Sequence, residues 1–326
     1  MSPHDDEEVS MSWMRPLGAT GLEVSALCLG GGPLGSMPRL FGQETPAERG
    51  IRTVLAALDS PIRFIDTSNG YSDGESERRI GEALRRVGGV PAGVVVETKT
   101  DPKGPDYSGD RVRRSVEESM ARLGLDRLPL VHLHDPENFE FDDIAGPGHA
   151  VEALVDLREQ GVVGAIGLAG GDVRVMARYL ALEVFDVLLV HNRWTLVDRS
   201  AGALVAEARR QGMGVLNAAV YGGGILAHQD DAGSPTTYGY RPAPPAVLAA
   251  VSAMRAVCAR YGTDLPTAAL QFSVRDETFA STIVGMSRPE RIAPTVAAAQ
   301  ASLPPDLFAE LEELLPSEEH WLDAPL

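Results

Sequence analysis

Residues 61–99, PIRFIDTSNGYSDGESERRIGEALRRVGGVPAGVVVETK, contain the unit that decides the fold. The apolar runs at 63–67 and 94–99 have the length and β-branched content of buried strands. Between them, residues 75–87 have the apolar spacing of an amphipathic helix. A strand, a helix and a second strand in this order predict a parallel β–α–β unit.

The same unit recurs along the chain. The expected strands lie at Val24–Leu29, Arg63–Thr67, Val94–Lys99, Leu130–His134, Val163–Leu168, Val187–His191, Gly214–Ala218 and Ser281–Gly285. Helical patterns occupy 46–59, 75–87, 109–124, 148–160, 172–181, 200–211, 245–273 and 288–300. Eight such units fit a closed (β/α)8 TIM barrel of the α/β class better than an open sheet, which more often has five or six strands.

Three segments lie outside this repeat. Residues 1–12 are predicted to be a disordered acidic tail, so that 13–326 form a single barrel domain. Residues 222–245 are rich in Gly, Pro, Ser and Thr, which predicts a long loop after strand seven and a candidate lid. Residues 303–315 have leucines on one side and predict an extra C-terminal helix that packs on the barrel.

Composition narrows the class of partner. The 326 residues include 29 Lys and Arg against 46 Asp and Glu, a formal charge of −17. This charge argues against nucleic acid and anionic membranes, and we expect a small-molecule substrate, with a homo-oligomer also compatible. The two cysteines, Cys28 and Cys258, exclude a disulfide framework. Together with a start that lacks a signal-peptide pattern, they predict a cytoplasmic protein.

Ionisable side chains end consecutive predicted strands, where a barrel places its chemistry. Asp66 ends strand two, Tyr71 lies in the following loop, Lys99 ends strand three and His134 ends strand four. A lysine at a barrel mouth needs a carboxylate partner, which Asp66 can supply. A cation beside a phenol lowers its pKa, so we expect Tyr71 to exchange a proton near neutral pH. The four residues therefore predict a proton-transfer site.

A metal site is an alternative for the same strand ends. His132 and His134 share one face of a strand, Asp135 follows them, and His191 ends strand six. Strands five and eight supply no further ligand, because they end in Leu168, Ala169 and Gly170 and in Val284 and Gly285. We therefore predict that no metal is bound.

Glycines follow the first predicted strand in a pattern that is easily misread. Residues 30–35, GGGPLG, match the spacing of a dinucleotide-binding loop. Such a loop must open a helix, which Pro33 and Pro38 disfavour. We instead expect Gly31 and Gly32 to let the backbone approach a ligand at the barrel mouth.

Four stretches resemble the aldo-keto reductase family. These are 17–25 (LGATGLEVS), 64–71 (FIDTSNGY), 130–136 (LVHLHDP) and 164–168 (GAIGL), and the similarity extends over nearly the whole chain. The resemblance implies a hydride-transferring oxidoreductase that uses NADP or NAD. It also implies that Tyr71 is the general acid or base, that Lys99 and Asp66 tune it, and that His134 orients the substrate oxygen.

The resemblance further implies a set of cofactor contacts. Ala169 and Gly170 stand where the family often has a serine and an asparagine that hold the carboxamide, which His191 or Asn192 could bind instead. Arg288 or Arg291 could meet a 2′-phosphate, so that both NAD and NADP remain open. The full set of predicted cofactor contacts is Gly31, Gly32, Asp66, His191, Asn192, Ala218, Tyr221, Gly285, Met286, Ser287 and Arg291.

The substrate class follows from a further segment. Residues 192–199, NRWTLVDR, resemble the branch of the family that oxidises aldoses or acts on pyridoxal, which implies a small carbonyl or hydroxyl substrate.

A second hypothesis for the function is a regulatory barrel that binds the cofactor with little turnover, as the resemblance to potassium-channel β subunits allows. A metal-dependent hydrolase is the third hypothesis.

Overall fold

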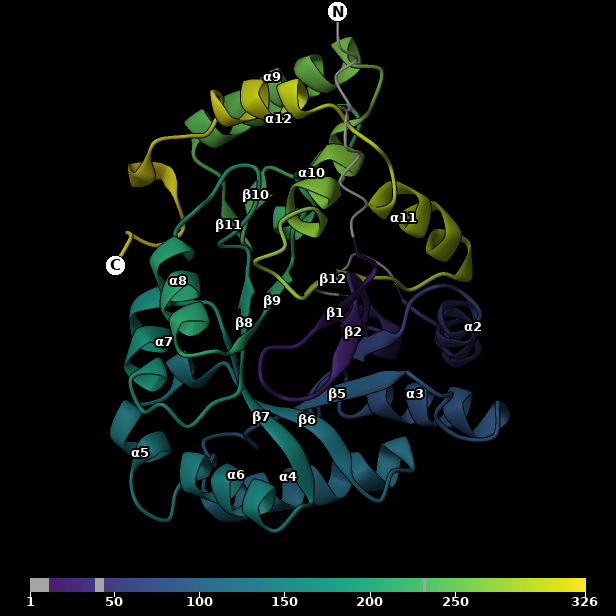
Figure 1. The fold of residues 1–326 in the computed structure, drawn as a ribbon, viewed down its shortest axis with the longest axis vertical. Coiled ribbons are helices and arrows are strands. Elements are labelled where there is room, and N and C mark those ends of the chain that lie inside the picture. Colours follow the sequence, from purple (N-terminus) through teal and green to yellow (C-terminus); the bar gives the residue numbers. More distant parts are fainter. Residues whose placement is uncertain (1–11, 39–43, 231–232) are drawn as a thin grey trace, which may run out of the picture.

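The computed structural model describes residues 12–38, 44–230 and 233–326. Eight parallel strands close into a barrel in the order β12-β3-β4-β5-β6-β7-β8-β9 (Figure 1). Their bounds are Leu27–Gly30 (β3), Phe64–Asp66 (β4), Val95–Thr100 (β5), Leu128–His134 (β6), Val163–Gly170 (β7), Val187–His191 (β8), Gly214–Ala218 (β9) and Ser281–Gly285 (β12). The predicted (β/α)8 TIM barrel is therefore confirmed, and the predicted tail lies outside the described residues except for Ser12.

Helices follow the strands and cover the outside of the barrel (Figure 1). They are Ala47–Leu58 (α2), Glu75–Arg86 (α3), Gly109–Leu123 (α4), Ala150–Glu159 (α6), Val173–Leu180 (α7), Gly202–Arg210 (α8), Leu265–Val274 (α10) and Ile292–Ala299 (α11). Their ends have local causes. Ser108 caps α4 by accepting a hydrogen bond from the Arg111 backbone N–H, and Gly124 ends that helix at a φ of 71°.

Alternation along the strands separates two cores. On β5, Val96 packs with the helices, whereas Val95 joins an apolar cluster inside the barrel with Phe64 and Leu130. Glu97 and Lys99 continue the inward face of the strand, because residues two apart share one side. The barrel interior is thus apolar near the amino-terminal ends of the strands and becomes polar toward their carboxyl ends.

The first predicted strand is divided in the structure. Glu23–Ser25 (β2) pairs with Met14–Pro16 (β1) in a hairpin, and the barrel strand begins only at Leu27. The expectation of one strand at Val24–Leu29 was wrong in this respect. Leu17, in the turn of the hairpin, joins the apolar cluster inside the barrel. The hairpin therefore covers the barrel at the amino-terminal ends of its strands.

The segments around the last third of the chain also differ from expectation. The helical region 245–273 is split into α9 (Pro245–Arg260) and α10, because Gly262 turns the chain at a φ of 70°. The loop 222–245 contains a short hairpin of β10 (Thr237–Tyr238) and β11 (Arg241–Pro242). The predicted C-terminal helix is α12 (Pro305–Glu312), which packs against α9.

The remaining described elements are short. They are α5 (Phe141–Ala145) and the 3-10 turns η1 (Gly32–Gly35), η2 (Pro136–Asn138), η3 (Gly222–Gly224), η4 (Pro289–Arg291) and η5 (Glu318–His320). Within the described ranges, no helix combines the length and the apolar character needed to cross a membrane.

Close packing between α3 and α4 yields a stability prediction. A Cβ at Gly81 of α3 would lie 2.1 Å from the Arg122 carbonyl oxygen of α4. We expect Gly81→Ala to lower the free energy of unfolding by about 1–3 kcal/mol, because overpacking against backbone outweighs the gain of about 1 kcal/mol in helix propensity. Urea denaturation measures this change. Glu117→Ala, at an exposed position of α4, is the control, and an unchanged midpoint for Gly81→Ala would contradict the packing.

Candidate active site

A cavity of about 600 Å³ opens at the carboxyl ends of the barrel strands. The four residues predicted to exchange protons, Asp66, Tyr71, Lys99 and His134, all line it. They come from β4, the loop after β4, β5 and the end of β6, which are neighbours in the barrel. Parallel strands in register bring their carboxyl ends to one rim, so residues distant in sequence share one cavity.

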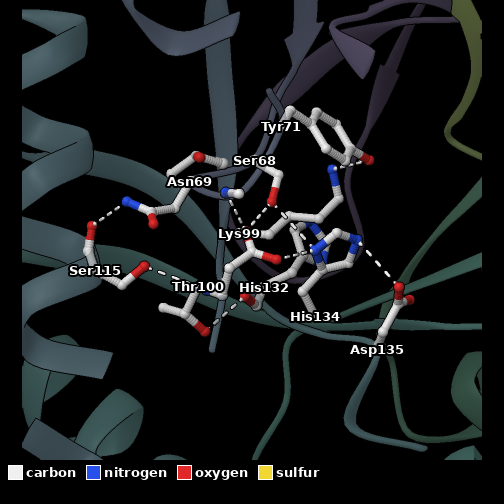
Figure 2. A network of polar contacts seen from close by, with 12 residues as sticks. Ser68, Asn69, Tyr71, Lys99, Thr100, Ser115, His132, His134 and Asp135 are labelled. Carbon is white, nitrogen blue, oxygen red and sulfur yellow. Dashed lines mark hydrogen bonds and ion pairs between the residues drawn. The ribbon is translucent and has the colours of Figure 1, made fainter. Parts of the chain in front are cut away.

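Lys99 is held by three partners. Its Nζ donates to Asp66 Oδ1, to the Thr67 carbonyl oxygen at 2.7 Å and to Tyr71 Oη at 3.4 Å. Figure 2 shows the amine reaching the Tyr71 hydroxyl from the strand below it. An ammonium has three protons to donate, so these contacts fix both its position and its direction.

The Lys99–Asp66 pair is almost completely buried, with side chains 2% and 5% exposed. Burial alone would lower the pKa of Lys99, but Asp66, Tyr71 and Glu97 together outweigh it and the pKa is raised. Burial raises the pKa of Asp66 to about 6, against the opposing effect of Lys99. Lys99 is therefore a cation at neutral pH, and part of its charge is balanced by Asp66.

The pKa of Tyr71 does not follow the expectation from the sequence. Burial raises it more than the Lys99 ammonium lowers it, and the charge of Asp66 adds to the increase. The expected lowering was wrong because a buried phenol loses hydration and because its cation is already paired. Tyr71 is thus a protonated phenol at neutral pH, which suits a proton donor.

His134 is oriented by a carboxylate that the sequence did not identify. Its Nδ1 lies 2.7 Å from Asp101 Oδ1 and 3.1 Å from Ser68 Oγ, and Ser68 also donates to Asp101. Asp101 is held in turn by the Gly70 backbone N–H at 2.6 Å. These contacts assign the Nδ1 proton to the bond with Asp101, and a carboxylate behind a histidine fixes both its tautomer and its ring orientation.

The ring of His134 stands edge-on to Tyr71, with centroids 5.7 Å apart. Burial alone would lower the pKa of His134, but Asp101 and Asp135 outweigh it and the pKa is raised. The raised pKa favours the doubly protonated ring. Its Nε2 lies 3.8 Å from Asp135 Oδ2 (Figure 2). Nε2 and the Tyr71 hydroxyl can therefore donate to one oxygen placed between them.

The histidine pair of the metal alternative does not converge. His132 Nε2 binds Glu97 Oε2 at 2.9 Å inside the barrel, whereas His134 Nδ1 binds Asp101. The described residues contain a different grouping of Asp135, Glu137 and His191, whose ligand atoms lie within 4.8 Å of one another. One oxygen of Glu137 is already used by the Gly171 backbone N–H at 2.6 Å.

The predicted cofactor contacts lie in four places. Those that line the cavity are Gly32, Asp66, His191, Ala218, Tyr221 and Gly285. Gly31 lies beneath the rim, where a Cβ would be 2.5 Å from the Asp66 carbonyl oxygen. Asn192 is buried behind His191 and donates to its Nδ1 at 3.1 Å. The others follow β12 beyond the lining of the cavity, and their roles stay predictions: Met286, Ser287 and Arg291.

Comparisons with known proteins identify the family of the chain. The model of the Aldo/keto reductase family matches residues 26–316. An L-galactose dehydrogenase of Arabidopsis thaliana is 32% identical over 290 residues, which cover 87% of each chain. A D-threo-aldose 1-dehydrogenase of a Pseudomonas species is 30% identical over 90% of this chain and 95% of its own. A pyridoxal 4-dehydrogenase of Microbacterium luteolum is 30% identical over 91% and 96%.

A solved structure supports the same fold. The holo form of an aldo-keto reductase from Bacillus halodurans superimposes with a TM-score of 0.75 at 22% identity, covering 95% of this chain and 99% of that chain. The family match and the relatives named as dehydrogenases support an oxidoreductase. The chain belongs to the aldo/keto reductase family, as the resemblance in its sequence implied.

The contact between Asp101 and His134 yields a prediction. We expect Asp101→Asn to lower the pKa of His134 by about 1 or more, because the amide removes the adjacent negative charge. A histidine titration followed by NMR measures this pKa, with the resonance assigned by its loss in His134→Gln. Asp110→Asn, at a position 81% exposed, is the matched control. An unchanged titration of His134 in Asp101→Asn would refute the assigned contact.

Proposed function

We propose that the protein is an NAD(P)-dependent oxidoreductase that transfers hydride between a nicotinamide and the carbonyl or hydroxyl group of a small substrate. The observation that carries the proposal is the contact of 3.4 Å between Lys99 Nζ and Tyr71 Oη, next to the His134 ring. These groups place a proton donor and a charge that stabilises its phenolate at one point of a cavity.

The cavity fits a nicotinamide dinucleotide in its size and in its wall. Its volume of about 600 Å³ lies within the usual range of about 300–1,000 Å³ for cofactor sites. Gly30, Gly32, Gly223, Gly224 and Gly285 contribute backbone without a side chain to the wall, which leaves room for an extended ligand. His191 also lines the cavity, at the end of β8, and can meet the carboxamide.

The residues of this chain perform the proton half of the reaction. A bound nicotinamide supplies the hydride for reduction and accepts it in oxidation. In reduction, the carbonyl oxygen accepts hydrogen bonds from Tyr71 Oη and His134 Nε2. Tyr71 then gives its proton to that oxygen as the carbon receives hydride, and the Lys99 ammonium stabilises the phenolate left behind. In oxidation the phenolate takes the alcohol proton.

The relatives support the finer proposal about the substrate. Two of them are named as sugar dehydrogenases and one as a pyridoxal dehydrogenase, each at about 30% identity. We therefore propose that this chain acts on an aldose or on pyridoxal. Both NADP and NAD are proposed as cofactors, with Arg288 or Arg291 as the residue that would meet a 2′-phosphate.

Removal of the phenol hydroxyl tests the proposed role of Tyr71. We expect Tyr71→Phe to lower kcat by a factor of about 10² to 10⁴, because the general acid is lost. Cofactor affinity, measured by quenching of protein fluorescence, should change little. Tyr261→Phe is the control. Tyr261 lies at the end of α9, and the substitution removes only its hydroxyl, which donates to Glu310. Retained turnover in Tyr71→Phe would exclude the assignment, and cofactor binding without turnover in the wild type would favour the regulatory barrel.

The raised pKa of Tyr71 gives the two directions different pH dependences. Reduction needs the phenol, which is present throughout the neutral range, so Tyr71 itself should cause no loss of kcat between about pH 6 and 8. Oxidation needs the phenolate, so its kcat should rise with pH over the same range. Initial rates in both directions in a constant-ionic-strength buffer measure this, and an oxidation rate that falls with pH would contradict the role of Tyr71.

A further inference from the structure

Two buried ionisable side chains beneath the active site are not used by the proposed mechanism. Glu97 of β5 and His132 of β6 are both completely buried. Glu97 faces inward two residues before Lys99, and its Cα is in register with that of Asp66 on β4. His132 is in register with Lys99 on the other side. Three neighbouring strands thus place four ionisable groups together inside the barrel.

Glu97 and His132 are directly bonded. Glu97 Oε2 lies 2.9 Å from His132 Nε2. His132 Nδ1 has no hydrogen-bond partner among the described residues, and it faces Gly167, where a Cβ would lie 2.1 Å away. A proton on Nδ1 would be a buried donor without an acceptor, whereas a bare lone pair there costs less. The single ring proton therefore belongs on Nε2, which donates to Glu97.

The other oxygen of Glu97 identifies where a second proton lies. Glu97 Oε1 has no N–H or O–H donor within the described part of the chain. Asp66 is in register with Glu97 on the neighbouring strand, so the two carboxyls can share a hydrogen bond when one of them is protonated. Asp66 is stabilised as the anion by Lys99. The proton of the carboxyl pair therefore resides on Glu97, which donates it to Asp66.

We propose that Glu97, which lies between Asp66 and His132, is a positioning residue that retains a proton. A neutral Glu97 avoids a second buried negative charge next to Lys99 and Tyr71. The proposal rests on the proposed function of this same site. A neutral Glu97 leaves the Lys99–Asp66 pair without excess charge, whereas an ionised Glu97 makes the group net negative. A negative charge below Lys99 opposes formation of the Tyr71 phenolate.

The surroundings of Glu97 support this assignment. The groups that face it are Asp66 from β4, Lys99 from its own strand, His132 from β6 and Cys28 from β3. Burial raises the pKa of Glu97 to about 8, against the opposing effect of Lys99. Burial also lowers the pKa of His132 to about 3, so that ring is neutral. Glu97 is thus the group of this layer that ionises just above neutral pH.

The variant Glu97→Gln tests the proposal, because it keeps both hydrogen bonds and cannot ionise. Its amide nitrogen donates to Asp66 and its amide oxygen accepts from His132. We expect its kcat at pH 7 to stay within about twofold of the wild type, since no hydrogen bond is lost. In oxidation, the wild-type kcat should rise with pH and level off near pH 8, whereas that of Glu97→Gln should continue to rise. The same plateau in both proteins would overturn the proposal.

A second measurement does not depend on turnover. Folded Glu97 keeps a proton that the unfolded chain releases near the ordinary pKa of 4.5. Ionisation of Glu97 in the unfolded chain therefore lowers the stability of the wild type as pH rises from about 5 toward 8. Urea unfolding of Glu97→Gln should therefore gain in midpoint over the wild type between pH 5 and pH 8. Glu117→Gln, on the exposed face of α4, should keep a constant difference.

The two measurements separate the possible failures. A pH-independent stability difference for Glu97→Gln would show that Glu97 does not hold a proton, and would overturn the inference whatever the enzyme does. An absence of turnover in the wild type with any aldose or aldehyde would instead refute the proposed function, while the stability difference would still report on Glu97. Glu97→Leu, which removes the partner of His132 and leaves Asp66 with Lys99 alone, should lose both activity and stability.

Discussion

The buried ion pair between Lys99 and Asp66 is the interaction on which the site depends. Its two side chains are 2% and 5% exposed, and an ammonium removed from water so completely needs a carboxylate beside it. The pair is held by the barrel itself, since the two residues end the neighbouring strands β5 and β4. This rigidity gives the third proton of Lys99 one direction, toward Tyr71. Without the pair, the phenol would be a buried hydroxyl with no charge to stabilise its ionised form.

A second carboxylate gives the other half of the site its orientation. Asp101 holds His134 from behind and is itself held by Ser68 and by the backbone of Gly70. The loops after β4 and β5 therefore lock together around one imidazole, whose edge meets the Tyr71 ring. The Lys99 ammonium, through Tyr71, and the His134 imidazole therefore both act on the substrate oxygen, from different strands. Below them, Glu97 and His132 extend the polar layer into the barrel and limit its net charge.

The sequence predicts the barrel and the three strand-end residues of the site because both follow from regular periods. Inward positions alternate along a strand, and parallel strands align their ends, so Asp66, Lys99 and His134 meet without knowledge of any loop. Asp101 was missed because a loop conformation returns its carboxylate to the strand end. The pKa of Tyr71 was misjudged because its direction is a balance between burial and charge that only coordinates provide. The break at Gly262 was missed because both sides have helical patterns.

The most direct test of the account is hydride transfer in a single turnover with reduced cofactor deuterated at C4, comparing the wild type with Lys99→Met. The account predicts that deuterium appears on the carbonyl carbon of an aldehyde substrate in the wild type. In Lys99→Met, transfer should slow by a factor of about 10² or more, because the phenolate loses its cation, while cofactor binding and circular dichroism persist. Undiminished transfer in Lys99→Met, or none in the wild type, would contradict it.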